Sequence, residues 1–164
     1  MKRFLLVMLT LFLCVIAVGC KGGESGAREV LEGYLQNLQD RTFEAAYDCL
    51  SDFDKTNITL EEFTEWREVS SEIQSIQSYS IGAKVDKFKN YEYKGARYNK
   101  AYGYLVAQEL DKHQDINLTG YDSKEYHIMV GQQDGDWKIA FLILDLKSVT
   151  DQYKRKLEEV KADQ

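Results

Sequence analysis

Few side chains in this sequence can carry out chemistry, and the cysteines are the most informative of them. The 164 residues include three cysteines, Cys14, Cys20 and Cys49, and two histidines, His113 and His127. There is no CxxC pair and no His/Cys set with the spacing of a metal site, so the sequence predicts neither a metal nor a cofactor. Cys49 is expected to be a half-buried structural thiol. Cys20 is therefore the strongest candidate for a chemically modified cysteine, because of the residues that precede it.

Cys20 ends an apolar run near the start of the chain. Lys2 and Arg3 form a short positive segment, and residues 4–18 are almost wholly apolar. A run of about 15 residues is shorter than the roughly 20 that a helix needs to cross a bilayer. It suits the apolar region of a signal peptide, and the small residues at 17–19 suit a cleavage site.

Small residues directly before a cysteine resemble the lipobox of bacterial lipoproteins. In that family the thiol is acylated and the chain is cut before the cysteine, which implies a signal peptide over 1–19 and lipidation of Cys20 with chains such as palmitate. Two or three chains, at about 0.8 kcal/mol per buried CH2, anchor a protein stably. The resemblance implies the extracytoplasmic side of the cell envelope, at the outer membrane if the cell has one. An uncleaved anchor and a secretory signal with an incidental cysteine are the alternatives.

The charge balance limits the partners of the chain that follows. The net charge is −6, and loss of Lys2 and Arg3 with the leader would make the remainder more acidic. An acidic domain repels phosphate backbones, so no nucleic-acid binding is predicted. No basic patch for anionic headgroups is evident, and we therefore expect the lipid alone to hold the protein at the membrane.

Helical patterns fill the first part of the folded region. Residues 20–26 predict a lipidated tether that reaches about 20 Å. Apolar residues at helical spacing predict a first helix over 27–40, and Thr42 is placed to cap a short second helix. Residues 51–57 indicate a polar break.

A third helix has the clearest start signal. Thr59 and Glu62 form a capping box, and the helix is expected to end near Ser70. The next residues, 71–78, are ambiguous and can continue the helix.

The pattern then changes to period two, which is typical of strands. Residues 79–85 alternate between apolar and polar, 88–95 looks like a turn region, and 98–110 predicts a long strand. Two further strands, 122–133 and 136–146, flank the last turn.

Asp134-Gly135 in that turn is a strong hairpin signal and sets a register. The face predicted to be the core carries the pairs Val130 with Ile139, Ile128 with Phe141, and Tyr126 with Ile143. The opposite face carries the pairs Met129 with Ala140, His127 with Leu142, and Glu125 with Leu144. Both faces are too apolar for a free edge, so the hairpin is expected to be central in a curved sheet.

A last helix is predicted over 147–164. Ser148 or Asp151 can cap it, and Val149, Tyr153 and Leu157 lie on one narrow apolar stripe. We expect this stripe to dock on the sheet, with a partner protein as the alternative.

Helices followed by strands predict an α+β fold. We expect three N-terminal helices packed on a curved, mainly antiparallel four-stranded sheet, plus the C-terminal helix. Three stretches in this order resemble the nuclear transport factor 2-like (cystatin-like roll) superfamily: YLQNLQDRTFEAAY at 34–47, TLEEF at 59–63 and GDWKI at 135–139.

The resemblance covers residues 27–146. More narrowly, the chain is similar to short bacterial envelope lipoproteins of unknown function, and similar domains lie at the front of some penicillin-binding proteins. The superfamily implies a cone-shaped sheet with a pocket against the helices, but it does not imply one activity.

Two sites follow from these expectations. The candidate pocket in the cone is lined by Tyr34, Trp66, Tyr102, Tyr104, Tyr126, Trp137 and Phe141. The candidate interaction face on the other side of the sheet carries His127, Met129, Leu142 and Leu144. In the superfamily this outer face often forms a homodimer.

The function predicted is a non-catalytic domain that binds a small ligand or an envelope protein, held at the membrane by its lipid. One alternative is a small-molecule enzyme of the isomerase or dehydratase type. Ketosteroid isomerase, a catalytic member of the superfamily, uses an acid and phenols in the pocket. Asp145 and Tyr126 are the nearest equivalents here, and no other catalytic set is evident. The second alternative is an accessory factor of cell-wall machinery.

Overall fold

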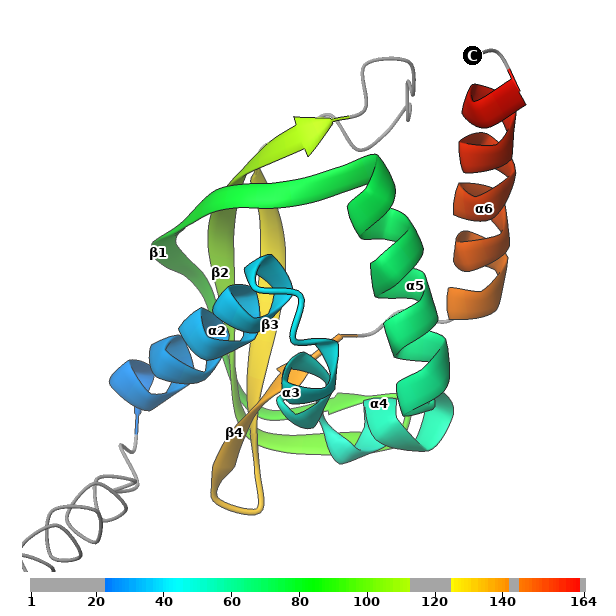
Figure 1. Ribbon diagram of the computed structural model, residues 1–164. Helices are drawn as coiled ribbons and strands as arrows, with labels where there is room; N and C mark the ends of the chain where they lie inside the picture. The colour runs from blue at the N-terminus through cyan, green and yellow to red at the C-terminus, as the bar shows by residue number, and fades with distance from the viewer. Residues whose placement is uncertain (1–22, 113–124, 142–144, 163–164) are drawn as a thin grey trace, which may run out of the picture.

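A computed structural model describes residues 23–112, 125–141 and 145–162 (Figure 1). Its elements, in chain order, are α2 (Glu24–Gln39), α3 (Phe43–Asp48), α4 (Asp52–Asn57), α5 (Leu60–Ile73), β1 (Gln74–Tyr93), β2 (Ala96–Lys112), β3 (Glu125–Gln133), β4 (Asp136–Ala140) and α6 (Leu146–Ala162). The α+β class with a four-stranded antiparallel sheet is confirmed. Among the described helices, none is both long and apolar enough to cross a membrane.

Within the described residues four helices precede the sheet, so the prediction of three is wrong. The segment read as a polar break forms α4, because the Ser51 hydroxyl accepts a hydrogen bond from the Asp54 amide at 3.2 Å and caps the helix. Helix α2 begins at Glu24, inside the segment predicted to be tether. Thr42 precedes α3 as expected, but its hydroxyl bonds to Asn37 instead of capping the helix.

The capping box at the start of α5 is confirmed. The Glu62 amide donates to the Thr59 hydroxyl at 3.2 Å, and the Thr59 amide donates to the Glu62 carboxylate at 2.8 Å. These reciprocal bonds satisfy two backbone donors that the helix itself cannot satisfy. The helix continues to Ile73, beyond the predicted end, and β1 follows without a loop.

The sheet has the order β1-β2-β3-β4, and each strand is antiparallel to the next. The prediction of a turn region over 88–95 is wrong, because β1 continues to Tyr93 and only Lys94 and Gly95 form the turn. The register of β1 against β2 shifts at three places between Ile76 and Asp86. Such bulges bend a strand, which explains the curvature of this long hairpin in Figure 1.

The predicted hairpin register is confirmed where the β3–β4 ladder extends: Val130 pairs with Ile139 and Met129 with Ala140. Val130 and Ile139 are both buried. Strand β4 is an edge strand, so the expectation of a central hairpin holds for β3 alone. The edge is covered locally, because Ile139 donates to the Cys49 carbonyl at 2.8 Å and accepts from the Ser51 amide at 2.9 Å. These bonds satisfy groups that an open edge would expose.

The main core lies between the helices and one face of the sheet. Figure 1 shows α2 and α3 crossing this face, with α5 beside them. Leu31 and Leu35 of α2, Phe63 of α5 and Val106 and Val130 of the sheet belong to one buried cluster. On the strands, inward residues alternate with outward ones, as one buried face requires.

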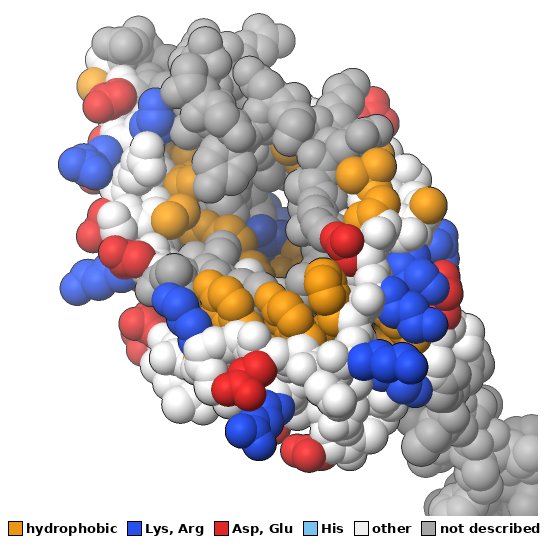
Figure 2. Space-filling model, turned by 180° about the vertical axis from the view of Figure 1, so that it is seen from behind, with side chains coloured by type: hydrophobic (Ala, Val, Ile, Leu, Met, Phe, Trp, Pro, Cys, Tyr) orange, Lys and Arg blue, Asp and Glu red, His pale blue; other side chains and the backbone are white. Residues whose placement is uncertain are grey.

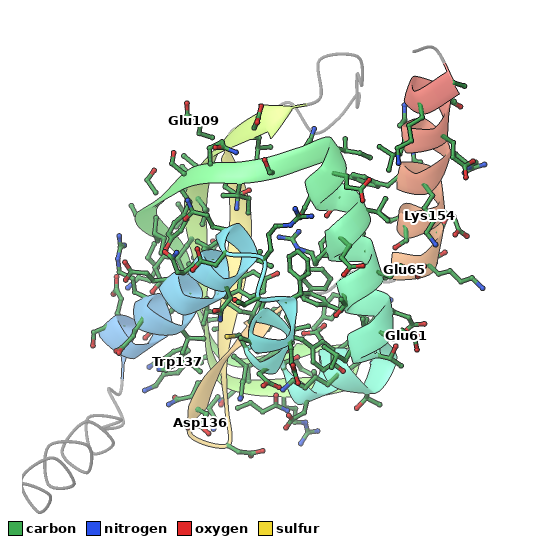
Figure 3. The ribbon with its side chains drawn as sticks, in the orientation of Figure 1. Glu61, Glu65, Glu109, Asp136, Trp137 and Lys154 are labelled. Atoms are coloured by element: carbon green, nitrogen blue, oxygen red, sulfur yellow. The ribbon has the colours of Figure 1, made fainter. Side chains whose placement is uncertain are left out.

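Helix α6 packs on α5 and not on the sheet, so the predicted docking on the sheet is wrong (Figure 1). Tyr153 and Ile73 form the buried centre of a small cluster of their own. Lys154 pairs with Glu65 at 2.5 Å across the two helices, and both residues are labelled in Figure 3. Lys161 pairs with Glu72 at 3.7 Å.

The start of α6 is capped by Asp145, whose carboxylate accepts a hydrogen bond from the Ser148 amide at 2.9 Å. This is the position at which a side-chain acceptor satisfies an unpaired helix donor. Ser148 and Asp151, the predicted caps, lie inside the helix.

Candidate ligand-binding site

The structure brings most of the predicted pocket residues into the main core. Tyr34, Trp66, Tyr102, Tyr104 and Trp137 are all buried there, and Phe141 packs against them. The side chain of Tyr126 lies outside the described part of the structure. The other residues are packed in the core, and the pocket itself stays a prediction.

The rings form two separate groups. In one, Trp66 lies 5.3 Å from Phe141 and 5.9 Å from Phe63, measured between ring centroids. In the other, Tyr102 stacks on Trp137 at 4.9 Å. Edge-to-face and offset-stacked rings at these distances pack favourably on one another. These aromatic residues thus stabilise the core in addition to bordering any binding site.

Arg67 is the polar residue that sequence reasoning missed on this side. Its guanidinium carbon lies 4.5 Å from the centroid of the Trp66 ring, and its side chain is half-buried. Its Nε is buried without a hydrogen-bond partner, and it forms no ion pair with a described residue. A buried donor of a charged group that lacks an acceptor is costly, so an anion at this guanidinium would stabilise the arrangement.

The sequence did contain a signal for Arg67. It follows Phe63 by four residues and is adjacent to Trp66, which places it at the edge of the apolar stripe of α5. A cation next to such a stripe is expected to bury its stem along apolar surface. Sequence alone does not show whether a carboxylate meets the charged end.

Three further nitrogen donors of the concave side lack partners within the described residues. They are Nε1 of Trp66, Nε1 of Trp137 and Nε2 of Gln108, and all three side chains are more than nine-tenths buried. Gln108 continues the inward-facing series of Tyr104 and Val106 on β2, across from α5. Buried donors normally have acceptors, so donors that lack one indicate a place for acceptor atoms. Figure 2 shows the molecule hollowed near its centre, with hydrophobic and basic side chains inside the hollow.

Tyr34 on α2 borders this region as a neutral phenol. Burial raises its pKa to about 12, and the positive charge of Arg67 acts in the opposite direction. The phenol therefore keeps its proton at neutral pH and adds no negative charge beside the guanidinium. We use the name Arg67 site for Tyr34, Trp66, Arg67 and Gln108.

The buried acid nearest to this region is already engaged. The Asp54 carboxylate accepts hydrogen bonds from the Ser51 hydroxyl at 2.6 Å and the Phe141 amide at 3.0 Å. The Tyr98 hydroxyl donates to the Ser51 oxygen at 3.3 Å. This network joins α4 to the end of β4 and to β2, which gives Asp54 a structural role.

The residues proposed for an enzyme are not brought together by the described structure. Asp145 is exposed and caps α6, and Tyr126 and His127 have side chains outside the described residues. Within those residues, no three of His, Cys, Asp and Glu form a metal site. Cys49 is half-buried, and burial raises the pKa of its thiol, which disfavours the reactive thiolate.

The predicted interaction face is only partly described. The register places His127 opposite Leu105 and Met129 opposite Gly103, on the sheet face away from Tyr102 and Tyr104. Leu142 and Leu144 lie outside the described residues. Leu105 is 37% exposed, which adds one apolar residue to this face.

Two surface hollows bounded by described residues lie elsewhere. One, of about 350 Å³, lies between α4, α5 and the start of α6. A wider one, of about 610 Å³, follows the exposed side of α6 and is lined by charged residues of mixed sign. Neither contains a residue of the Arg67 site or of the predicted pocket.

No protein-family model matches this sequence, and no curated protein or solved structure matches it significantly.

Proposed function

We propose that the protein is a lipid-anchored domain of the cell envelope that binds a small apolar anion at the Arg67 site without transforming it. The simplest ligand of this class is a carboxylate with an acyl or aromatic body. In this proposal the domain is a cystatin-like roll, with the ligand between α2, α5 and the concave face of the sheet.

One observation carries the binding site: the half-buried Arg67, whose guanidinium lies over the Trp66 ring and whose Nε is buried, has no counter-charge among the described residues. A carboxylate would supply the counter-charge and accept from the unpartnered nitrogens, and the rings would cover an apolar body. Charge-assisted hydrogen bonds of this kind are about twice as strong as neutral ones. A non-catalytic role is supported by the engagement of Asp54 in its own network.

The anchor is supported by the sequence around Cys20, which lies outside the described residues. Helix α2 starts at Glu24, so only a short connection separates the folded part from the cysteine. Acyl chains at Cys20 would keep the Arg67 site close to the membrane. A ligand that is itself apolar is concentrated there.

The binding proposal is tested by calorimetric titration of the full chain with laurate and with its neutral analogue dodecanol. Arg67→Gln is expected to weaken laurate binding by about 10- to 100-fold, since a hydrogen bond to a charged group contributes about 1.5–3 kcal/mol. Dodecanol binding should change little. Arg155→Gln, which removes an exposed charge of α6, is the matched control. The proposal is wrong if the wild-type chain binds no laurate, or if Arg67→Gln leaves the laurate affinity unchanged.

A further inference from the structure

The lower end of the β1–β2 hairpin carries four lysines on one face, which we name the lysine row: Lys84, Lys87, Lys89 and Lys100. Lys89 and Lys100 are directly opposite each other across the strands, and Lys87 is opposite Tyr102. The Nζ of Lys84 lies 4.9 Å from the centroid of the Tyr102 ring. The four lysines therefore surround one aromatic residue, although Lys100 is distant from the others in the sequence.

Most of this charge is not compensated within the described structure. Lys84 forms an ion pair with Glu24, whereas Lys87, Lys89 and Lys100 are exposed and pair with no described residue. Like charges directly opposite on two strands destabilise a sheet. A basic row of this kind, in a chain with a net charge of −6, is a local concentration of positive charge.

The row lies beside the point where the chain enters the domain. Glu24, the partner of Lys84, is the first residue of α2. Trp137, labelled in Figure 3, marks the same corner, because it stacks on Tyr102. At 3.3–3.6 Å per residue, the connection from Cys20 to Glu24 spans at most about 14 Å.

This short connection limits how far the start of α2 can move from the bilayer. If Cys20 is held in the membrane, the start of α2 and the adjacent lysines stay within about one to two Debye lengths of the headgroups, since that length is about 10 Å at 0.1 M salt. The net charge of the whole chain therefore does not predict the sign of the surface that meets the membrane.

We propose that the lysine row binds the anionic headgroups of the membrane that holds Cys20 and so fixes the orientation of the domain on the bilayer. This inference rests on the proposed lipid anchor. It replaces the expectation that the lipid alone holds the protein at the membrane. The acyl chains keep the protein at the membrane, and the lysines determine which face of the domain contacts it.

The test uses the full chain carrying Cys20→Ser, so that no acyl chain contributes. Its binding to vesicles of phosphatidylcholine alone is compared with binding to vesicles that also contain phosphatidylglycerol, by co-sedimentation at low and high salt. The leader contributes equally to every variant. The wild-type row is expected to give a preference for the anionic vesicles that high salt abolishes.

The decisive variant replaces Lys87, Lys89 and Lys100 with Gln. The preference is expected to fall by on the order of 100-fold, or about five-fold per lysine near the surface. The matched control replaces Lys147, Arg155 and Lys156 of α6 with Gln, which changes the net charge equally. The control should keep the preference within a few-fold.

An unchanged preference in the row variant would overturn the inference, and so would an equal loss in the α6 control. Failure of the lipid anchor is detected separately, by the mass of the wild-type protein extracted from cell membranes. If the mass shows an unmodified Cys20, the proposed lipid anchor is wrong. The vesicle comparison tests the lysines whether or not Cys20 is acylated.

Discussion

Arg67 differs from the aromatic residues around it in what its burial requires. Phe141 is stabilised by packing alone, because its ring is apolar and in contact with the Trp66 ring. A guanidinium held against the Trp66 ring loses hydration that packing does not replace. Its hydrogen-bonding groups need acceptors, and no described residue supplies them at Nε. The residue is therefore better explained by a ligand than by the stability of the fold.

A residue-scale prediction concerns Tyr34. Its pKa is raised from 10.0 to about 12 by burial, so between these values the folded chain keeps a proton that the unfolded chain releases. The contribution of Tyr34 to stability is thus fully present below about pH 10 and is lost as the pH rises toward 12. We expect the free energy of unfolding, measured with urea at several alkaline pH values, to fall in this window.

Tyr34→Phe provides the comparison for this prediction. It removes the titrating hydroxyl and keeps the ring, so the decline with pH should be shallower than in the wild type. Equal slopes for the two proteins would show that Tyr34 does not stay protonated because of burial.

At the scale of elements, α6 differs from the helices that form the main core. Only its first turn reaches that core, through Leu146, and the rest packs on α5 through Tyr153 and its neighbours. Two ion pairs between exposed side chains add little, since exposed pairs contribute at most about 1 kcal/mol each. The stability of α6 therefore depends mainly on one small apolar cluster.

We expect Tyr153→Ala to release α6 while leaving the sheet intact. Loss of a buried aromatic side chain costs about 3–5 kcal/mol, and here the loss falls on a cluster distinct from the main core. Hydrogen exchange should show at least about a ten-fold loss of protection in α6 amides after the first turn, because local opening follows local stability. Amides of β2 should keep their protection.

Gln152→Ala is the matched control, because Gln152 is exposed on the same helix. It should leave exchange in α6 unchanged. Equal loss of protection in α6 and β2 with Tyr153→Ala would instead show that α6 unfolds together with the whole domain.

At the scale of the whole molecule, the proposed anchor and the two proposed binding surfaces depend on the same geometry. Helix α2 joins them, because it begins close to Cys20, pairs with the lysine row through Glu24 and carries Tyr34 of the Arg67 site. A domain lying on the lysine row is held in a defined orientation, which a flexible linker would not provide.

At the scale of the whole molecule, the prediction concerns the proposed lipid anchor at Cys20. Cys20→Ser removes the only atom to which the proposed lipid can be attached, so the protein should move from the membrane fraction to the soluble fraction when cells are fractionated. Cys49→Ser, at the half-buried thiol of the domain, is the control and should stay with the membranes. Retention of Cys20→Ser in membranes would show that something other than acylation holds the protein.

The sequence by itself determined the features that depend on neighbouring residues. Thr59 and Glu62 predicted the start of α5, and Asp134-Gly135 predicted the register of β3 and β4, because capping and tight turns are satisfied by local hydrogen bonds. It missed α4, where Ser51 and Asp54 form a cap that resembles an ordinary polar loop in the sequence. It also placed a turn over residues that continue β1.

Only the tertiary structure decided which helix α6 packs on, that Arg67 lacks a counter-charge, and that Lys100 lies opposite Lys89. Each of these depends on residues far apart in the chain. A side chain is unpaired, or two charges are adjacent, only after long-range pairing has fixed its surroundings. Composition reports the average charge of the chain, whereas binding depends on the charge at one surface.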